Sequence, residues 1–381
     1  MKVYFDNAAT TPVNKEVIDI MVKVMEEDFG NPSSTHSHGR KVRTLIEESR
    51  KQVATLLNCT PGEIFFTSGG TEADNMALRK AVTDLSIKNI ISSSIEHHAV
   101  SHTLKELADQ HQVDLHMVNF YQNGHIDLNH LESLLKQYPD ALVSLMHANN
   151  ELGNLLDIDK VGELCRQHNA LFQCDTVQTI GHLPIDLQKT NITFLAGGAH
   201  KFNGPKGVGF IYINHKTKIK PFITGGSQER NMRGGTENVY GIVGMAKAME
   251  LAYTNLEKDS KYIQGLKDYM IAELKANFED VRFNGDPEGN SLYTVLNVNF
   301  PPTPIAEMIL FKLDIAGISA SGGSACSSGS NVGSHVLAAL NVPQDRPSVR
   351  FSFGKQNTKE EIDYVMGKLK EMLKPNQQSG I

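Results

Sequence analysis

The sequence predicts an α/β protein in two parts, because the spacing of apolar residues changes along the chain. Over the first two thirds, short apolar runs alternate with amphipathic stretches, which is typical of a largely parallel, doubly wound sheet with helices on its faces. The runs expected to form strands are residues 62–70, 89–94, 114–120, 141–147, 170–175, 192–198 and 207–213.

Helices are expected between most of these strands, where apolar residues recur at helical spacing. Clear examples follow Pro12, span 71–81, and begin near Ala99. The stretch from 239 to 278 also has helical character, and its charge pattern changes near residue 257. Beyond it we expect strands near 293–299 and 347–353 and helices near 304–313 and 358–372. We therefore assign 13–256 to a large domain, and 1–12 with 257–381 to a small α+β domain.

Bulk composition is that of an ordinary globular protein. The 381 residues include 40% apolar and 21% charged residues, and the net charge of −6 argues against a general nucleic-acid binder. Four cysteines without a Cys-x-x-Cys pair do not form a disulfide framework, so a reduced, cytoplasmic setting is expected. The sequence has no run of 18 apolar residues, so no transmembrane helix is expected. No signal-peptide pattern occurs near Met1.

One biased segment, residues 319–334, contains Cys326 within SASGGSACSSGSNVGS. Its glycine and serine content predicts a mobile loop without regular structure. Seen alone, Cys326 is more readily a free surface cysteine than a nucleophile. The other three cysteines, Cys59, Cys165 and Cys174, lie in apolar patterns and are expected to be packed as small hydrophobic residues.

Two charged residues end apolar strands, where open α/β sheets place their ligands. Lys201 lies in GAHKFNGPKGVG, and a buried lysine can form a Schiff base with an aldehyde cofactor. Asp175 lies in FQCDTVQTIG, where a carboxylate suits a protonated pyridine nitrogen. The alternatives are a loop lysine and a helix N-cap aspartate.

TSGGTEADN, residues 67–75, predicts a strand, a glycine turn and a helix start. The amides of Gly70 and Thr71 would bind a phosphate at the positive helix end, unless the segment is only a capping turn. His97, His98 and His102 suggest a metal, but a structural zinc site usually needs four ligands and no cysteine is near, so no metal is expected. An imidazole there can instead stack on a planar cofactor.

The order of these motifs is more specific than any one of them. Along the chain come the glycine turn, a histidine, Asn-Asn-Glu at 149–151, Asp-x-x-Gln at 175–178, His-Lys at 200–201, Arg-Gly-Gly-Thr at 233–236, and the Gly/Ser segment with one cysteine. This order resembles the class V aminotransferase family of fold-type-I pyridoxal 5'-phosphate (PLP) enzymes, and within it the NifS/IscS-type cysteine desulfurases. The likeness covers nearly the whole chain, from YFDNAATTP at 4–12 to VRFSFG at 349–354.

The resemblance implies PLP as the cofactor and a PLP-dependent transferase fold of type I, with a mostly parallel seven-stranded sheet in the large domain. It implies that Lys201 holds PLP, that Asp175 pairs with the pyridine nitrogen, and that Gln178 bonds the phenolic oxygen. His97 would stack on the ring, and Asn150 would lie near the substrate and the ring oxygen.

The same resemblance implies phosphate contacts from Gly70, Thr71 and His200. It implies that Thr236 serves the active site of a second subunit, so a homodimer is expected. Arg350 would bind the substrate carboxylate, since a guanidinium pairs well with a carboxylate.

GGSACSSGS matches the desulfurases that have a long cysteine loop, which implies that Cys326 is the sulfur acceptor. The implied reaction takes sulfur from L-cysteine, with Lys201 moving the α-proton and His97 assisting a thiol deprotonation, and yields alanine and a Cys326 persulfide. A protein partner, an iron–sulfur scaffold or a tRNA-thiolation relay, would then collect the sulfur; no membrane or direct nucleic-acid partner is expected.

Two residues depart from the family pattern. Gly198 stands where a serine often contacts the phosphate, and Thr176 stands where alanine or glycine often leaves room for the ring. The rival functions are another class V reaction, such as transamination or selenocysteine lysis, and a non-catalytic sulfur-transfer scaffold.

Overall fold

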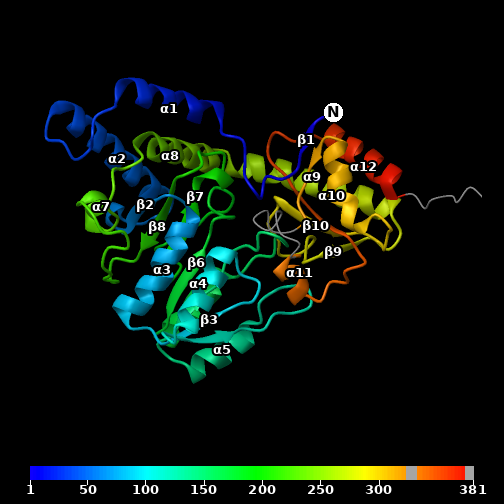
Figure 1. Cartoon of the computed structure of the whole chain (residues 1–381), viewed down its shortest axis with the longest axis horizontal. Coiled ribbons are helices and arrows are strands. Elements are labelled where there is room, and N and C mark those ends of the chain that lie inside the picture. Colours follow the sequence, from blue (N-terminus) through cyan, green and yellow to red (C-terminus); the bar gives the residue numbers. More distant parts are fainter. Residues whose placement is uncertain (323–332, 374–381) are drawn as a thin grey trace, which may run out of the picture.

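The protein is described by a computed structural model over residues 1–322 and 333–373. A large α/β part and a smaller α+β part lie side by side (Figure 1). No helix in these two ranges is long and apolar enough to cross a membrane.

The large part is built on a seven-stranded sheet, as the fold class predicts. Its order is β2-β8-β7-β6-β5-β3-β4, and only β8 is antiparallel to its neighbours. The strands are β2 (Ile64–Thr67), β3 (Asn89–Ser92), β4 (Asp114–Met117), β5 (Leu142–Ser144), β6 (Leu171–Asp175), β7 (Phe194–Gly198) and β8 (Gly209–Ile213). All seven fall within the predicted strand runs, because each buried strand is a short apolar run.

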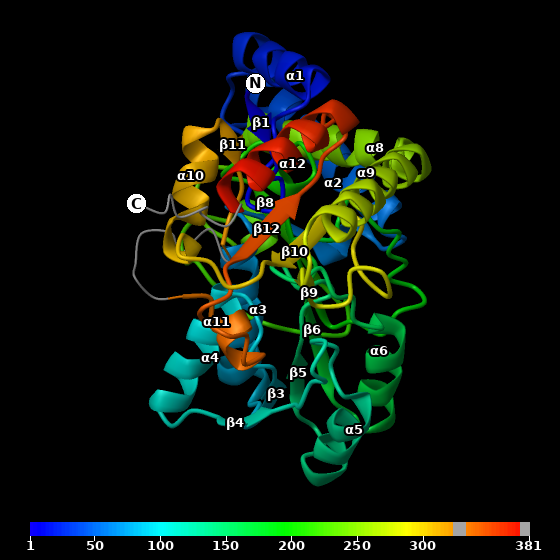
Figure 2. The same ribbon diagram turned by 90° about the vertical axis from the view of Figure 1, so that its right-hand side faces the viewer.

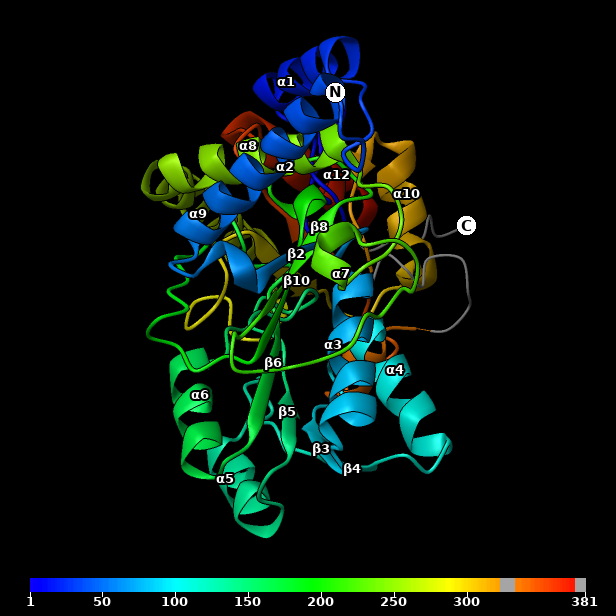
Figure 3. The ribbon, with the colours of Figure 1, turned by 90° about the vertical axis from the view of Figure 1, so that its left-hand side faces the viewer.

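Helices cover both faces of this sheet, since successive strand residues point to opposite sides. Phe65 and Ile90 pack with α3 (Gly70–Leu85) and α4 (His98–Asp109), whereas their neighbours Phe66 and Ile91 join the core of the other face. Figure 3 shows α3 and α4 on one side of the sheet and α5 and α6 on the other. The helices of that second side are α2 (Ser37–Leu56), α5 (Leu128–Gln137), α6 (Ile158–Gln167) and α8 (Val239–Thr254), and α1 (Lys15–Glu27) packs on α8.

The smaller part has its own antiparallel sheet of order β12-β10-β9, covered by helices (Figure 2). Its elements are α9 (Leu256–Asn277), β9 (Arg282–Asn284), β10 (Val295–Asn299), α10 (Ile309–Ile315), β11 (Ile318–Ser319), α11 (His335–Ala339), β12 (Ser348–Ser352) and α12 (Lys359–Leu373). The chain start joins it through β1 (Val3–Tyr4), which pairs with β11. Val3 and Phe5 belong to its hydrophobic core, which supports our proposal that 1–12 and 257–381 form one domain beside 13–256.

Two local features differ from the sequence-based expectation. The helical stretch 239–278 is two helices, because Asn255 interrupts α8 and α9 with a non-helical backbone. The expectation that 319–334 has no regular structure is wrong at its start. Ser319 ends β11, and Ser321 forms a bridge with Arg350, because neighbouring strands supply the backbone partners that the segment's own composition does not predict.

Candidate active site

The expected site residues converge on one cavity of about 180 Å³. Strands β3, β5, β6 and β7 are adjacent and parallel, so the segments that follow them all leave at one edge of the sheet. This edge brings together residues that are far apart in sequence. The expected residues that line the cavity are Gly70, Thr71, His97, Asn150, Asp175, Gln178, His200, Lys201 and Arg350.

Lys201 lies just beyond β7, in a 3-10 turn (Ala199–Lys201). Its Nζ donates hydrogen bonds to the carbonyl oxygens of Ala8, at 2.5 Å, and Ala9, at 2.8 Å. His182 Nε2 lies 3.0 Å from the Lys201 carbonyl oxygen, so the backbone at Lys201 is also held by a side chain. The N-terminal segment therefore crosses the cavity and holds the lysine amine in it.

Asp175 ends β6 and is buried at the floor of the cavity. Burial raises the pKa of its carboxyl to about 6, although a hydrogen bond from the Val177 amide and the charge of Lys201 both act to lower it. Ionising a buried carboxyl is costly, so a protonated ring nitrogen would be a favourable partner.

Two further carboxyl groups lie behind Asp175. Asp74, on α3, is 1% exposed, lines the same cavity and accepts a 2.9 Å hydrogen bond from Gln173 Nε2. Burial, and then the charges of Asp175 and Glu96, raise its pKa well above the usual range. Burial likewise raises the pKa of Glu96, whose Oε1 accepts a hydrogen bond from the Met146 amide. Asp74 was not expected at the site from the sequence, because its burial depends on the packing of α3 against the sheet.

The N-terminus of α3 opens into the cavity at Gly70 and Thr71. First-turn amides of a helix have no partners within that helix, so they can bind an anion such as a phosphate. A Cβ at Gly70 would lie 2.4 Å from Val177 Cγ2, so only glycine fits there. A Cβ at Gly198 would lie 3.5 Å from the Gly70 nitrogen, which is an ordinary contact. A small side chain at position 198 would therefore fit, and it would lie beside the amides at the start of α3.

His97 and His200 border the cavity with uncharged rings. His97 is the N-cap of α4, and its Nδ1 accepts a 3.1 Å hydrogen bond from the Ala99 amide. Burial, and then the charge of Lys201, lower the pKa of His97 to about 4. The same two causes lower the pKa of His200 to about 4, and its Nδ1 lies 3.3 Å from the Thr10 hydroxyl. A neutral imidazole suits stacking on a planar ring and can accept a proton.

Thr176, which departs from the family pattern, is not among the residues that line the cavity. The Thr176 hydroxyl donates a 2.8 Å hydrogen bond to the Ala196 carbonyl oxygen, and the residue is buried away from the cavity. Its neighbour Val177 lines the cavity instead. Gln178 also lines it, and its Nε2 donates to the Ala8 carbonyl oxygen at 3.0 Å. The sequence could not show which side chain faces inward, because the chain turns directly after Asp175.

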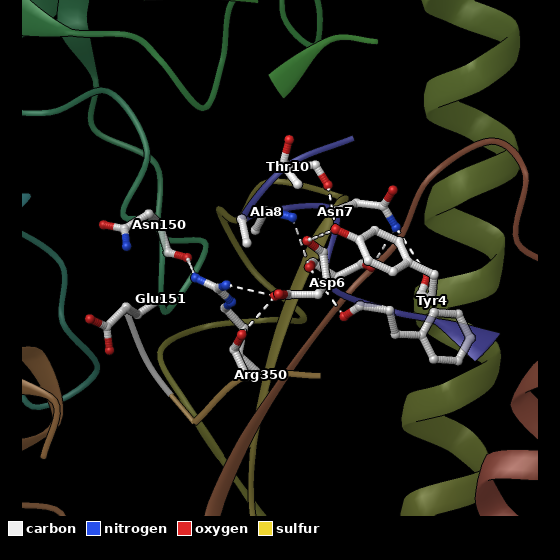
Figure 4. Close-up of polar contacts among 12 residues, drawn as sticks. Tyr4, Asp6, Asn7, Ala8, Thr10, Asn150, Glu151 and Arg350 are labelled. Atoms are coloured by element: carbon white, nitrogen blue, oxygen red, sulfur yellow. Dashed lines mark hydrogen bonds and ion pairs between the residues drawn. The ribbon is translucent and has the colours of Figure 1, made fainter. Parts of the chain in front are cut away.

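Arg350 forms the cavity wall that belongs to the small domain (Figure 4). The residue is 1% exposed. Its Nη1 donates a 2.8 Å hydrogen bond to the Asn150 carbonyl oxygen, and its Nη2 donates a 2.9 Å hydrogen bond to Asp6 Oδ1. The sequence analysis missed Asp6, which reaches the site only because β1 packs into the small domain.

The two remaining predicted residues have different outcomes. Cys326 falls outside the described residues. Thr236 is exposed and borders a separate surface groove with Phe29 and Tyr240. As for metals, no group of three or more histidine, cysteine or acidic residues in the described ranges is arranged to hold an ion.

These groups together fit pyridoxal 5'-phosphate. Helix-terminal amides suit its phosphate, the Asp175 carboxyl suits its ring nitrogen, and the Lys201 amine suits its aldehyde. A fold with this site at the carboxyl edge of a mostly parallel sheet is that of a fold-type-I PLP enzyme.

The comparisons with known proteins place the chain in such a family. Residues 3–365 match the family model described as Aminotransferase class-V, so the chain belongs to the class V aminotransferases, whose members are PLP enzymes. Its relatives include "Cysteine desulfurase IscS" of Dictyoglomus turgidum, 43% identical over 98% of this chain and 94% of that protein.

Solved structures agree with this placement. A "NifS-like protein" superposes with a TM-score of 0.90 at 37% identity, covering 98% of this chain and 99% of that one. The structure titled "SspA in complex with cysteine" superposes with a TM-score of 0.81 at 29% identity, covering 94% of this chain and all of that one.

Proposed function

We propose that the chain is a PLP-dependent cysteine desulfurase, which takes sulfur from L-cysteine, releases L-alanine and carries the sulfur as a persulfide on Cys326. The observation that carries this proposal is one cavity lined by an amine at Lys201, a buried carboxyl at Asp175 and a guanidinium at Arg350. The full-length similarity to IscS and NifS-like proteins supports the same chemistry.

We assign the cofactor contacts from the groups that line the cavity. When bound, PLP supplies an electron sink that stabilises negative charge next to the substrate nitrogen. Asp175 would hold the ring nitrogen protonated, Gln178 would bond the ring oxygen, and His97 would stack on the ring. Gly70, Thr71 and His200 would hold the phosphate.

The substrate is oriented by the small domain. Arg350 would bind the α-carboxylate of L-cysteine, with Asn150 beside it. The neighbouring SspA structure, whose title records a complex with cysteine, supports a substrate of this kind. Lys201 would then take the proton from Cα and return one during turnover, because its amine lies in the same cavity.

Cys326 completes the reaction in this proposal. Its thiolate attacks the substrate sulfur, the Cβ–S bond of the substrate breaks, and the sulfur remains on Cys326. We assign His97 as the group that would accept a thiol proton, because its ring lines the same cavity. An acceptor protein, of an iron–sulfur assembly or a tRNA-thiolation pathway, would receive the outer sulfur.

We also propose a homodimer in which Thr236 reaches the partner's phosphate site. Thr236 lies on an exposed groove rather than at the cavity of its own chain. Nearby, large apolar residues on α1, just after α1 and on α8 are exposed, although such residues are normally buried. The side chain of Phe29 is 76% exposed, and those of Met25 and Tyr240 are nearly half exposed.

The test is to incubate the purified protein with PLP and record its visible absorbance, and then to add L-cysteine with a thiol reductant. We expect the absorbance of bound PLP to change and sulfide and alanine to form in equal amounts. Bound PLP without sulfide would point to another class V reaction, and no PLP absorbance would contradict the proposed site. Chromatography with light scattering would report the dimer.

A further inference from the structure

Arg350 already has an anionic partner before any substrate carboxylate arrives. The Nη2–Asp6 Oδ1 contact of 2.9 Å is an ion pair, and the arginine side chain is almost fully buried while that of Asp6 is 20% exposed. Arg350 Nε has no hydrogen-bond partner within residues 1–322 and 333–373. The guanidinium therefore has a neutralising charge on one side and unused donor capacity on another.

Asp6 is held in this position by its surroundings. The Ser321 hydroxyl donates a 2.8 Å hydrogen bond to the same Oδ1 atom that accepts from Arg350. The backbone of Asp6 bridges Ser352 in β12, and its carbonyl oxygen accepts from the Tyr4 hydroxyl at 3.3 Å. Figure 4 shows Asp6 between Tyr4 and the Arg350 guanidinium. A carboxylate fixed on both its backbone and its side chain cannot easily move away when a ligand binds.

We propose that Asp6 is a resident counter-ion that weakens the hold of Arg350 on the α-carboxylate shared by L-cysteine and L-alanine, so that the product can leave. This inference rests on the proposed function. Substrate and product carry the same amine and carboxylate, so an arginine without a counter-ion would retain alanine as tightly as it binds cysteine. With Asp6 in place, an entering carboxylate meets a guanidinium whose charge is already balanced and a second anion beside it.

The cleanest variant is Asp6→Asn, which keeps an oxygen acceptor for Arg350 and removes only the charge. Two amines serve as probes, each followed by the change in bound-PLP absorbance: L-alanine, and ethylamine, which has the same carbon skeleton without the carboxylate. We expect the Kd for L-alanine to fall at least about tenfold. The Kd for ethylamine should stay unchanged, and product inhibition by L-alanine should become stronger in the desulfuration assay.

A matched control is Asp280→Asn. Asp280 Oδ2 pairs with Arg346 at 2.6 Å in the same domain, and neither residue lines the cavity. This variant should leave both dissociation constants unchanged. Should Asp6→Asn fail to fold, Asp6→Ser removes the same charge and should shift the L-alanine Kd in the same direction.

Unchanged or weaker L-alanine binding in Asp6→Asn would overturn the proposal, as would an equal change for both amines, which would indicate a general structural role. Assaying the wild-type protein distinguishes failure of this proposal from failure of the proposed function. Sulfide release from L-cysteine by the wild type, with no shift in the variant, would refute only the role of Asp6, whereas no release by the wild type would refute the proposed function itself.

Discussion

The two walls of the cavity differ in the charged groups that they bury. On one side, Asp175 and Asp74 line the cavity and Glu96 lies near them; all three are buried, and burial raises the pKa of each carboxyl. On the small-domain side, Arg350 is equally buried but is paired with Asp6 and with the Asn150 carbonyl oxygen. One wall thus holds buried carboxyl groups whose pKa is raised, and the other holds a cation that is already paired with a carboxylate.

This difference teaches which groups each wall can accept. A buried carboxyl with a raised pKa is stabilised by a positive or proton-bearing partner, such as a ring nitrogen. A neutralised guanidinium with free donor capacity can bind a carboxylate that must also leave again. The first arrangement suits a cofactor that stays, and the second suits a substrate and product that exchange.

The largest effect is expected from Lys201→Ala, which removes the amine between the two walls. Turnover of L-cysteine should fall by at least about a thousandfold, since both covalent attachment and proton transfer depend on this side chain. Sulfide release and visible absorbance measure the two losses. Lys206→Ala, at an exposed lysine five residues on, is the control and should behave as the wild type. Comparable turnover in Lys201→Ala would contradict the assignment.

Arg350→Ala should weaken substrate binding without weakening PLP binding. We expect KM for L-cysteine to rise about a hundredfold, because a charge-assisted pair to the carboxylate is lost, while PLP remains bound. Arg350→Lys keeps the charge without the planar donors and should recover only part of the affinity. A large loss of PLP instead of substrate affinity would show that the two walls are not independent.

Asp175→Asn should change catalysis and stability in opposite directions. Turnover is expected to fall about a hundredfold, because the ring nitrogen loses its anionic partner. The PLP-free protein should become more stable above pH 6, by about 1–3 kcal/mol.

The sign follows from the pKa of Asp175, which is raised from an ordinary value of 3.8 to about 6 in the folded chain. The folded state therefore binds more protons than the unfolded state between these values, so the carboxyl costs stability as pH rises from 3.8 to 6 and the cost is constant above. Urea unfolding of the wild type and the variant at pH 4 and 7.5 measures the difference in their free energies of unfolding. An equal stability difference at both pH values would contradict this account.

The smallest effect is expected from Gly198→Ser, which adds a hydroxyl near the first amides of α3. A Cβ fits there without a close contact, so we expect PLP to dissociate about threefold more slowly. Gly198→Ala adds the Cβ without the hydroxyl and should give no gain. Faster PLP loss from the serine variant would show that the space is needed by the cofactor itself.

Much of this architecture was predictable from local patterns. The strands of the large sheet are short apolar runs, and the family resemblance implied that Lys201, Asp175 and Arg350 share one site, where they indeed line one cavity. Asp6 and Asp74 were not predicted, because their roles depend on packing between distant segments. The direction of the Thr176 side chain was not predictable either, because the alternation of side chains ends where β6 turns into the next segment.

The central claim is that sulfur leaves L-cysteine through Cys326. The most direct test is to react the PLP-loaded protein with L-cysteine without reductant, alkylate it, and locate the added sulfur by peptide mass spectrometry, with Cys165→Ser as a control for a buried thiol. We predict one extra sulfur atom on the Cys326 peptide alone, unchanged in Cys165→Ser and absent in Cys326→Ser, which should keep PLP but release no sulfide. Added sulfur on another cysteine would contradict the account, as would sulfide release by Cys326→Ser at the rate of the wild type.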